Sequence, residues 1–150
     1  MKLGDLLRKL QGNSLAFDSR FLLYHLEPDS RFEPVTSALL RLVESGKSRA
    51  SASILVLHDL YLRLALSKDR DAVATCQAVL LNFPNLRFVS IDEQIVADAA
   101  YLQSKHGLDA WIALHLSCAR NDGAKFFVTA TSGLPPVPEI ETVSLESIHS

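Results

Sequence analysis

Apolar residues recur along this chain with two alternating spacings. Short apolar runs, typical of buried strands, alternate with longer segments in which apolar residues return every three or four positions, typical of helices. Strands are expected at 14–17, 50–54, 86–91, 125–129 and 142–145. Helices are expected at 3–10, 20–26, 34–45, 55–67, 69–82, 93–106 and 109–120, with a loop at 28–30.

The alternation of these elements predicts the fold class. Strands that are separated by helices pair in parallel, because the connecting helix carries the chain back to the starting edge of the sheet. We therefore expect an α/β protein, a three-layer α/β/α sandwich with a central, mainly parallel sheet. In such sheets ligands bind outside the carboxyl ends of the strands. No repeat or linker divides the sequence, so residues 1–150 are expected to form one domain, with 1–13 as a short N-terminal helical extension.

Composition restricts the possible functions. The net charge of −2 argues against nucleic-acid binding through bulk electrostatics, so any such role must rest on a local site. No apolar run reaches the roughly 18 residues of a membrane span, and the first residues lack the pattern of a secretory signal. The two cysteines, Cys76 and Cys118, form no CxxC pair and are expected to be reduced thiols. These features together favour a cytoplasmic protein that does not enter the membrane.

Asp18 is the strongest candidate for a functional residue. It stands between the expected strand 14–17 and the expected helix 20–26, at the edge of the sheet where α/β proteins place their sites. An aspartate at this place can also be the N-cap of the helix, and one residue can do both. A phosphatase with a DxDx motif is a rival interpretation, but Arg20 occupies the place of its second aspartate.

Two segments carry a family resemblance. "LAFDSRFLLYHLE" has a strand that ends in Asp18, followed by a serine and an apolar helix, and "SASILVLHDL" places Asp59 six positions after Ser53. Both resemble signatures of the PIN domain family, which includes the VapC-like toxin ribonucleases of toxin–antitoxin pairs. Three later segments continue the similarity in the same order, so that it covers about residues 14–148: "DEQIVADAAYLQSKHGL", "GAKFFVTATSGL" and "VPEIETVSLES".

The resemblance implies a metal-dependent endoribonuclease. In the family, carboxylates from distant parts of the chain hold Mg²⁺ or Mn²⁺, hard cations that prefer oxygen ligands. The ion lowers the pKa of a bound water and neutralises the RNA phosphate. Asp18 and Asp59 match the first two acidic positions, although the family usually has the longer glutamate at the second. The resemblance also implies RNA as the substrate, an antitoxin protein as a partner and a homodimer.

The third and fourth acidic positions depart from the family. The ungapped match puts Ile112, which cannot bind a metal, at the third position. The alternative match uses Asp109, which lies one helical turn earlier on the same face and could instead be an N-cap. The fourth position is Thr131, which brings no charge, while Thr129 matches a threonine whose hydroxyl supports the site. The predicted catalytic residues are therefore Asp18, Asp59, Asp109 and Thr129, of which the three aspartates are the predicted metal ligands.

The other polar residues are weaker candidates. Arg20 could contact an RNA phosphate or simply face solvent. The five histidines show no spacing typical of a zinc site, and His115 is expected to be a core or half-buried residue. Apolar positions on the helices at 55–67 and 69–82 could form a twofold dimer interface or simply fill the core. These positions are Leu60, Leu64, Val79 and Leu80.

Two functions therefore compete. The first is a metal-dependent, toxin-like endoribonuclease whose activity is weak because two acids have been replaced. The second is a degenerate PIN domain that binds RNA or a protein without cutting. The number of carboxylates that reach one site separates the two functions, because two or three acids seldom organise two ions.

Overall fold

A five-stranded sheet forms the centre of the protein. The computed structural model describes residues 1–26 and 31–149, and the loop expected at 28–30 lies outside them. The strand order is β3-β2-β1-β4-β5, and every neighbouring pair is parallel. The strands are β1 Ser14–Phe17, β2 Arg49–Ser53, β3 Leu86–Val89, β4 Phe126–Thr129 and β5 Glu141–Ser144. This arrangement confirms the predicted α/β fold with a central parallel sheet.

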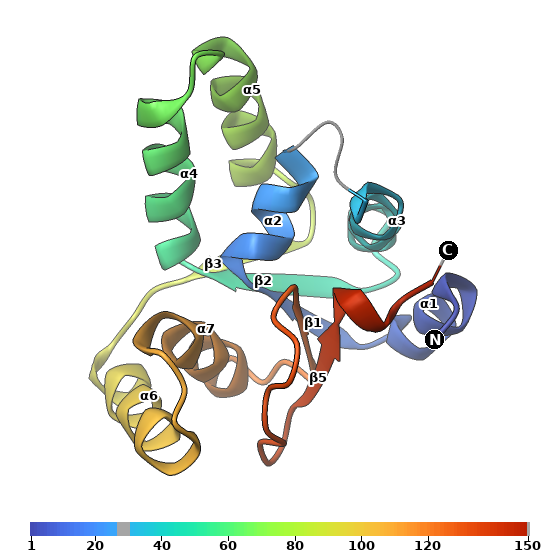
Figure 1. The fold of residues 1–150 in the computed structure, drawn as a ribbon. Coiled ribbons are helices and arrows are strands. Elements are labelled where there is room, and N and C mark those ends of the chain that lie inside the picture. Colours follow the sequence, from blue (N-terminus) through green and yellow to red (C-terminus); the bar gives the residue numbers. More distant parts are fainter. Residues whose placement is uncertain (27–30, 150) are drawn as a thin grey trace.

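Helices cover both faces of the sheet (Figure 1). They are α1 Leu3–Leu10, α2 Ser19–Leu26, α3 Glu33–Glu44, α4 Leu55–Leu66, α5 Arg70–Leu81, α6 Glu93–His106 and α7 Ala110–Asn121. Every expected helix is present, and its ends are displaced by no more than one residue. After β5 the chain forms a short 3-10 turn, Leu145–Ser147, which the sequence did not predict. None of the helices in the described ranges is long and apolar enough to cross a lipid bilayer.

Alternation along the strands sends neighbouring side chains into two separate cores. In β1, Leu15 and Phe17 pack with residues of α1, α2 and α3 on one face, whereas Ala16 packs with residues of α6 and α7 on the other. In β4, Phe127 lies in this second core. The rings of Phe17 and Phe21 stack with centroids 4.1 Å apart, which fixes the start of α2 against the end of β1. The two cores therefore position the corner at which β1 turns into α2.

α4 and α5 form a helical hairpin that projects beyond the sheet (Figure 1). Leu60 and Leu80 are buried in the core, so the prediction that they belong to an association surface is wrong for these two residues. Leu64 is partly buried, but Val79 is 54% exposed and Leu66 is 75% exposed. The outer surface of the hairpin is therefore partly apolar, and further exposed apolar residues on it are Tyr61, Leu62 and Leu81.

A largely buried ion pair holds α6 to α7. Asp98 of α6 pairs with Arg120 of α7, and each side chain is less than one-fifth exposed. The same carboxylate accepts hydrogen bonds from Ser117 and from Asn121, each at 3.1 Å. One side chain of α6 therefore binds three residues of α7 and fixes the helix whose first turn faces the candidate site.

Replacing Asp98 tests this contact. In Asp98→Ala, the Arg120 charge loses its internal partner, and breaking a buried pair in this way costs about 3 kcal/mol of stability. Asp5 offers a matched control, because it pairs with Arg8 on the surface with both side chains more than half exposed. Asp5→Ala should cost less than about 1 kcal/mol. Urea unfolding followed by circular dichroism measures both losses, and an equally small loss in the two variants would contradict the prediction.

Candidate functional site

Asp18 lies buried at the corner where β1 turns into α2, and only 2% of its surface is exposed. Its Oδ1 accepts the backbone N–H of Phe21 at 2.8 Å, so the residue closes the first turn of α2, as the N-cap interpretation anticipated. Its Oδ2 accepts a hydrogen bond from the hydroxyl of Thr129, the last residue of β4. One carboxylate thus joins the start of a helix to the end of a neighbouring strand.

Thr129 reaches Asp18 because β1 and β4 are neighbours in the sheet. The register pairs Phe17 with Val128, so the residues that follow them meet at the same edge. Thr129 is fully buried, and its oxygen accepts the backbone N–H of Thr131 at 2.9 Å. The hydroxyl therefore accepts from one side and donates its hydrogen to Asp18 on the other, which fixes the direction of the bond.

Burial raises the pKa of Asp18 above that of an ordinary aspartate. The hydrogen bonds from Thr129 and Phe21 act in the opposite direction, as does the positive charge of Arg20. Because burial is the larger effect, keeping Asp18 ionised costs the folded protein free energy. A cation bound next to this carboxylate would reduce that cost.

A cavity of about 210 Å³ opens beside Asp18. It is lined by Asp18, Ser19, Arg20, Asp109, Trp111, Ile112, His115 and Thr131. The cavity brings together most of the residues predicted for the site, but Asp59 and Thr129 do not line it. A larger cavity of about 530 Å³ opens at the amino ends of the strands, around Arg49 and Arg87, and contains none of the predicted site residues.

Asp109 lines the cavity and is also the N-cap of α7. Its Oδ1 accepts the backbone N–H of Ile112 at 3.0 Å, which confirms the capping interpretation. Within the described part of the chain, no hydrogen bond reaches its second oxygen, which leaves that oxygen available to a ligand. Ile112 is only 8% exposed and packs in the core shared by α6 and α7. The position that the ungapped match assigns to the third acid is thus occupied by a buried apolar side chain.

Asp59 lies on α4 and is engaged with an aromatic residue. Its Oδ2 accepts the indole N–H of Trp111 at 3.0 Å, and its Oδ1 lies 3.4 Å from Nδ1 of His58. Trp111 itself lines the cavity. Asp59 is therefore connected to the candidate site through the indole ring rather than by lining it directly.

Ser19 and His115 form a buried pair that the sequence did not predict. Ser19 Oγ lies 3.0 Å from His115 Nε2, and both residues line the cavity. The other ring nitrogen, Nδ1, is buried without a hydrogen-bond partner among the described residues. Burial lowers the pKa of His115 to about 4, although the charges of Asp59 and Asp109 act in the opposite direction. The imidazole is therefore neutral near pH 7, as befits the buried residue that was expected.

The oxygen donors at the site fit one divalent ion rather than a pair. Among residues 1–26 and 31–149, no group of three or more His, Cys, Asp or Glu side chains is placed to hold a metal ion. Asp18 and Asp109 line the cavity, whereas Asp59 is bonded to Trp111. Mg²⁺ is commonly bound by one or two carboxylates, with water and substrate phosphate oxygens completing its coordination. The two carboxylates that line the cavity therefore match in number what one such ion takes from a protein.

Comparison with known proteins gives one family match and several structural matches. A profile of the family described as PIN domain matches residues 15–135. No curated protein sequence gives a significant match. VapBC2 from Rickettsia felis, solved with a DNA fragment from its promoter, matches with a TM-score of 0.70 and 16% identity over 87% of this chain and 98% of that chain.

Two further solved structures share this fold. A toxin–antitoxin complex from Klebsiella pneumoniae matches with a TM-score of 0.63 and 14% identity, over 87% of this chain and 97% of that chain. VapC20 from Mycobacterium tuberculosis, described as a toxin that cleaves the sarcin–ricin loop, matches with a TM-score of 0.60 and 15% identity, over 75% of this chain and 86% of that chain. At such low identities the likeness shows the fold alone.

The neutral, buried His115 predicts that stability falls in acid. Its pKa is lowered from 6.5 to about 4 in the folded protein, so between these values the unfolded chain binds the extra proton and is favoured as the pH decreases. Above about pH 6.5 the contribution of His115 to the free energy of unfolding is constant. Between that value and its pKa in the folded protein, this free energy falls by about 1.4 kcal/mol for each pH unit of acidification. Thermal unfolding should show that His115→Gln loses less stability than wild type between these pH values.

His25 provides the control for this measurement. Burial lowers its pKa as well, but it lies outside the cavity lining, so His25→Gln should leave the contribution of His115 in place. The contribution of Asp18 to the pH dependence of stability has the opposite sign, because its raised pKa means that stability is lost as the pH rises through that pKa. The difference between the profiles of His115→Gln and His25→Gln therefore reports the contribution of His115. Parallel profiles for His115→Gln and wild type would count against the prediction.

Proposed function

This chain belongs to the PIN domain family, and we propose that it is a toxin-like PIN endoribonuclease with a weakened acidic site. The observation that carries the proposal is Asp18, a buried carboxylate that shares one cavity with Asp109 and Arg20. The cavity lies at the carboxyl ends of parallel strands, where α/β proteins bind their ligands. The fold is also that of VapC20, which is described as cleaving the sarcin–ricin loop, and this likeness supports RNA as the substrate.

Mg²⁺ or Mn²⁺ is the proposed cofactor, and Asp18 and Asp109 are the residues that would hold it. A bound ion of this kind lowers the pKa of a water molecule and neutralises phosphate charge. Thr129 donates its hydroxyl hydrogen to Asp18, so it positions the carboxylate without adding charge. Asp59 stays a predicted third ligand, and its carboxylate would have to serve the ion as well as the indole of Trp111.

Arg20 is proposed to bind an RNA phosphate. It is exposed at the cavity, and no hydrogen bond or ion pair of its guanidinium is found within residues 1–26 and 31–149. The protein as a whole carries a net charge of −2, so its surface offers little general attraction to nucleic acid. A local cation beside the carboxylates would therefore carry much of the contact with the backbone of RNA.

A binding module without catalysis is the second candidate function. Ile112 brings apolar surface to the cavity and Thr131 brings no charge, although the family resemblance implies acids at both positions. Fewer carboxylates attract a divalent ion less strongly, whereas the phosphate contact of Arg20 needs no ion. In this case the protein would bind RNA or another protein and leave it intact.

An antitoxin is the proposed protein partner. The Klebsiella pneumoniae structure with the same fold is described as a toxin–antitoxin complex, and VapBC2 is described as bound to promoter DNA. We propose that this chain is likewise held by a second, antitoxin-like protein in the cytoplasm. Copurification of the chain with the product of a neighbouring reading frame would provide direct support.

Mn²⁺ titration tests the cofactor proposal. Asp109→Asn should bind Mn²⁺ more weakly than wild type, because the amide has no charge while it still caps α7. The double variant Ile112→Asp, Thr131→Asp should bind at least about tenfold more tightly than wild type, a gain of about 1.4 kcal/mol. Calorimetry measures the affinities, and cleavage of a labelled RNA should follow the same order.

Asp92→Asn is the matched control for Asp109→Asn. Asp92 caps α6 by accepting the N–H of Ile95 at 2.9 Å, and it does not line the cavity, so its loss should leave Mn²⁺ binding unchanged. Equal Mn²⁺ affinity in wild type and Asp109→Asn would show that Asp109 only caps its helix. RNA binding without cleavage, even in the double variant, would favour the second candidate function.

A homodimer formed through the outer surface of the α4–α5 hairpin is also proposed. Leu66 and Val79 are largely exposed apolar residues of this surface, and a twofold interface would bury them. Leu66→Glu should convert the dimer to monomers, whereas Val96→Glu, a change at a 50% exposed residue of α6, should not. Light scattering measures the mass, and a monomeric wild-type protein at micromolar concentration would refute the proposal.

A further inference from the structure

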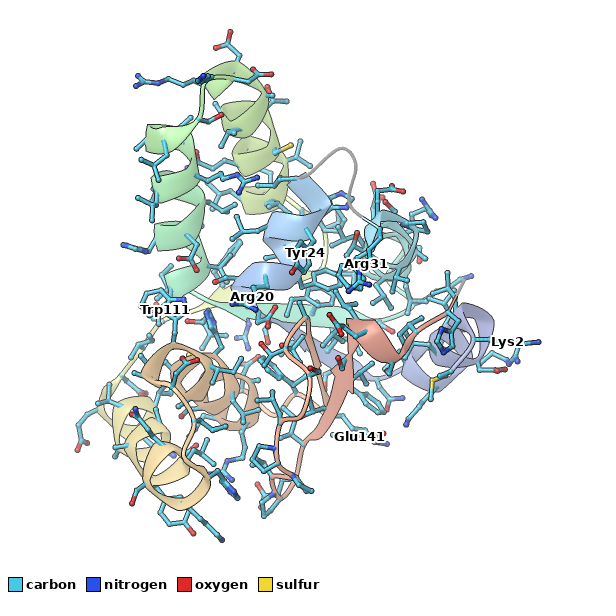
Figure 2. All side chains as sticks on the ribbon, in the orientation of Figure 1. Lys2, Arg20, Tyr24, Arg31, Trp111 and Glu141 are labelled. Atoms are coloured by element: carbon cyan, nitrogen blue, oxygen red, sulfur yellow. The ribbon has the colours of Figure 1, made fainter. Side chains whose placement is uncertain are left out.

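Trp111 is the single tryptophan of the chain, and it is 38% exposed beside the cavity. It belongs to the first turn of α7 and lines the cavity together with Arg20. Figure 2 shows Trp111 where α7 meets the beginning of α4, and Arg20 at the beginning of α2. A large aromatic ring is thus left partly in water next to an exposed cation and a buried carboxylate.

Three neighbours hold this indole ring in one orientation. Its N–H donates to Asp59 Oδ2 at 3.0 Å. The His58 ring lies 5.5 Å from it at 63°, and the His115 ring lies 5.9 Å from it at 83°, both in edge-on contacts. Such contacts stabilise aromatic pairs. Because the ring is already ordered, it would lose little further freedom when a flat ligand binds to it.

The chemistry around the ring suits a nucleotide. Bases stack on exposed aromatic side chains whatever their sequence, and a cation near the ring can bind the adjoining phosphate. Arg20 supplies that cation at the same cavity, and its guanidinium makes no ion pair with any described residue. A base within a duplex is already stacked on both sides, so the ring can accept only an unpaired base.

We propose that Trp111 is the stacking platform for one unpaired base of an RNA strand, that Arg20 contacts the adjacent phosphate, and that Asp59 is the positioning residue that holds the indole. This inference rests on the proposed RNA-directed function and adds the structural feature of RNA that is recognised. It also gives Asp59 a task that does not depend on a metal ion, namely the hydrogen bond to Trp111.

The single tryptophan makes the first measurement specific. Tryptophan emission comes from position 111 alone, and a base stacked on the indole quenches it. In the presence of EDTA, so that no divalent ion takes part, titration with a short single-stranded oligouridylate should quench the emission. A duplex RNA of the same length should leave the emission unchanged.

Substitutions at position 111 separate stacking from packing. Trp111→Leu and Trp111→Phe both lose the indole N–H, but only phenylalanine keeps an aromatic face. Anisotropy of a labelled oligouridylate should show about tenfold weaker binding by Trp111→Leu, which is within the range for one stacked base. Trp111→Phe should bind with an affinity between those of Trp111→Leu and wild type, because it keeps an aromatic face but loses the hydrogen bond to Asp59. Tyr101→Leu is the matched control, because Tyr101 is a 54% exposed aromatic residue of α6 that does not line the cavity.

Substitutions at position 59 test the positioning role. Asp59→Ala removes the acceptor of the indole N–H, so both the quenching and the affinity for oligouridylate should decrease. Asp59→Asn keeps an oxygen that can accept this bond and should restore both quantities. A residue that contributed only its charge to RNA or metal binding would not be rescued by the neutral amide.

The outcomes distinguish this inference from the proposed function. If wild type binds oligouridylate but Trp111→Leu binds it equally well, or duplex RNA binds equally well, the stacking platform is wrong and the RNA-directed function stands. If Trp111→Phe is as weak as Trp111→Leu, the indole acts through its bond to Asp59 and stacking is again refuted. If wild type binds neither RNA, the proposed function falls together with the inference. Thermal unfolding verifies that each variant is folded.

Discussion

A carboxylate that is removed from water must find its hydrogen bonds inside the protein, and the candidate site depends on how Asp18 finds them. One partner is the Phe21 amide at the start of α2, and the other is the Thr129 hydroxyl at the end of β4. The Phe21 amide lies only three positions along the chain, whereas the Thr129 hydroxyl reaches Asp18 only when β1 pairs with β4 in the parallel sheet. Asp18 therefore links the fold to the site. Because burial raises the free energy of its ionised form, a cation bound beside it would stabilise the folded protein.

Local patterns predicted the elements well, because the spacing of apolar residues and the capping residues act within a few positions of the chain. The pairs that define the site could not be predicted in this way. Asp59 meets Trp111 across 52 positions and Ser19 meets His115 across 96 positions, and both pairs depend on how α4, α2 and α7 are rotated about their axes. The only local sign was that Ser19 follows Asp18 directly. The wrong prediction for Leu60 has the same origin, since α4 is apolar on nearly every side and its sequence does not reveal its inner face.

Ile112 shows how stability and function compete at one position. Its side chain belongs to the core of the α6–α7 layer and lines the cavity at the same time. An acid there would attract a metal ion but would also add a negative charge to the cavity that Asp18 and Asp109 already line. Acidic side chains that are clustered for catalysis generally destabilise the folded protein that carries them. This chain has an apolar residue instead, and the carboxylate of Asp109 caps the same helix and also lines the cavity.

The pairing of β1 with β4 also determines when the pocket can assemble during protein synthesis. Asp18 and Thr129 are separated by 111 positions, so most of the chain must leave the ribosome before the two can meet. Until then the buried carboxylate has no strand beside it, and β1 is an open edge with β2 as its only available neighbour. Contacts of such long range form late because the chain between them must first be ordered. A nascent or truncated chain would therefore lack the pocket even when all of its N-terminal elements have been translated.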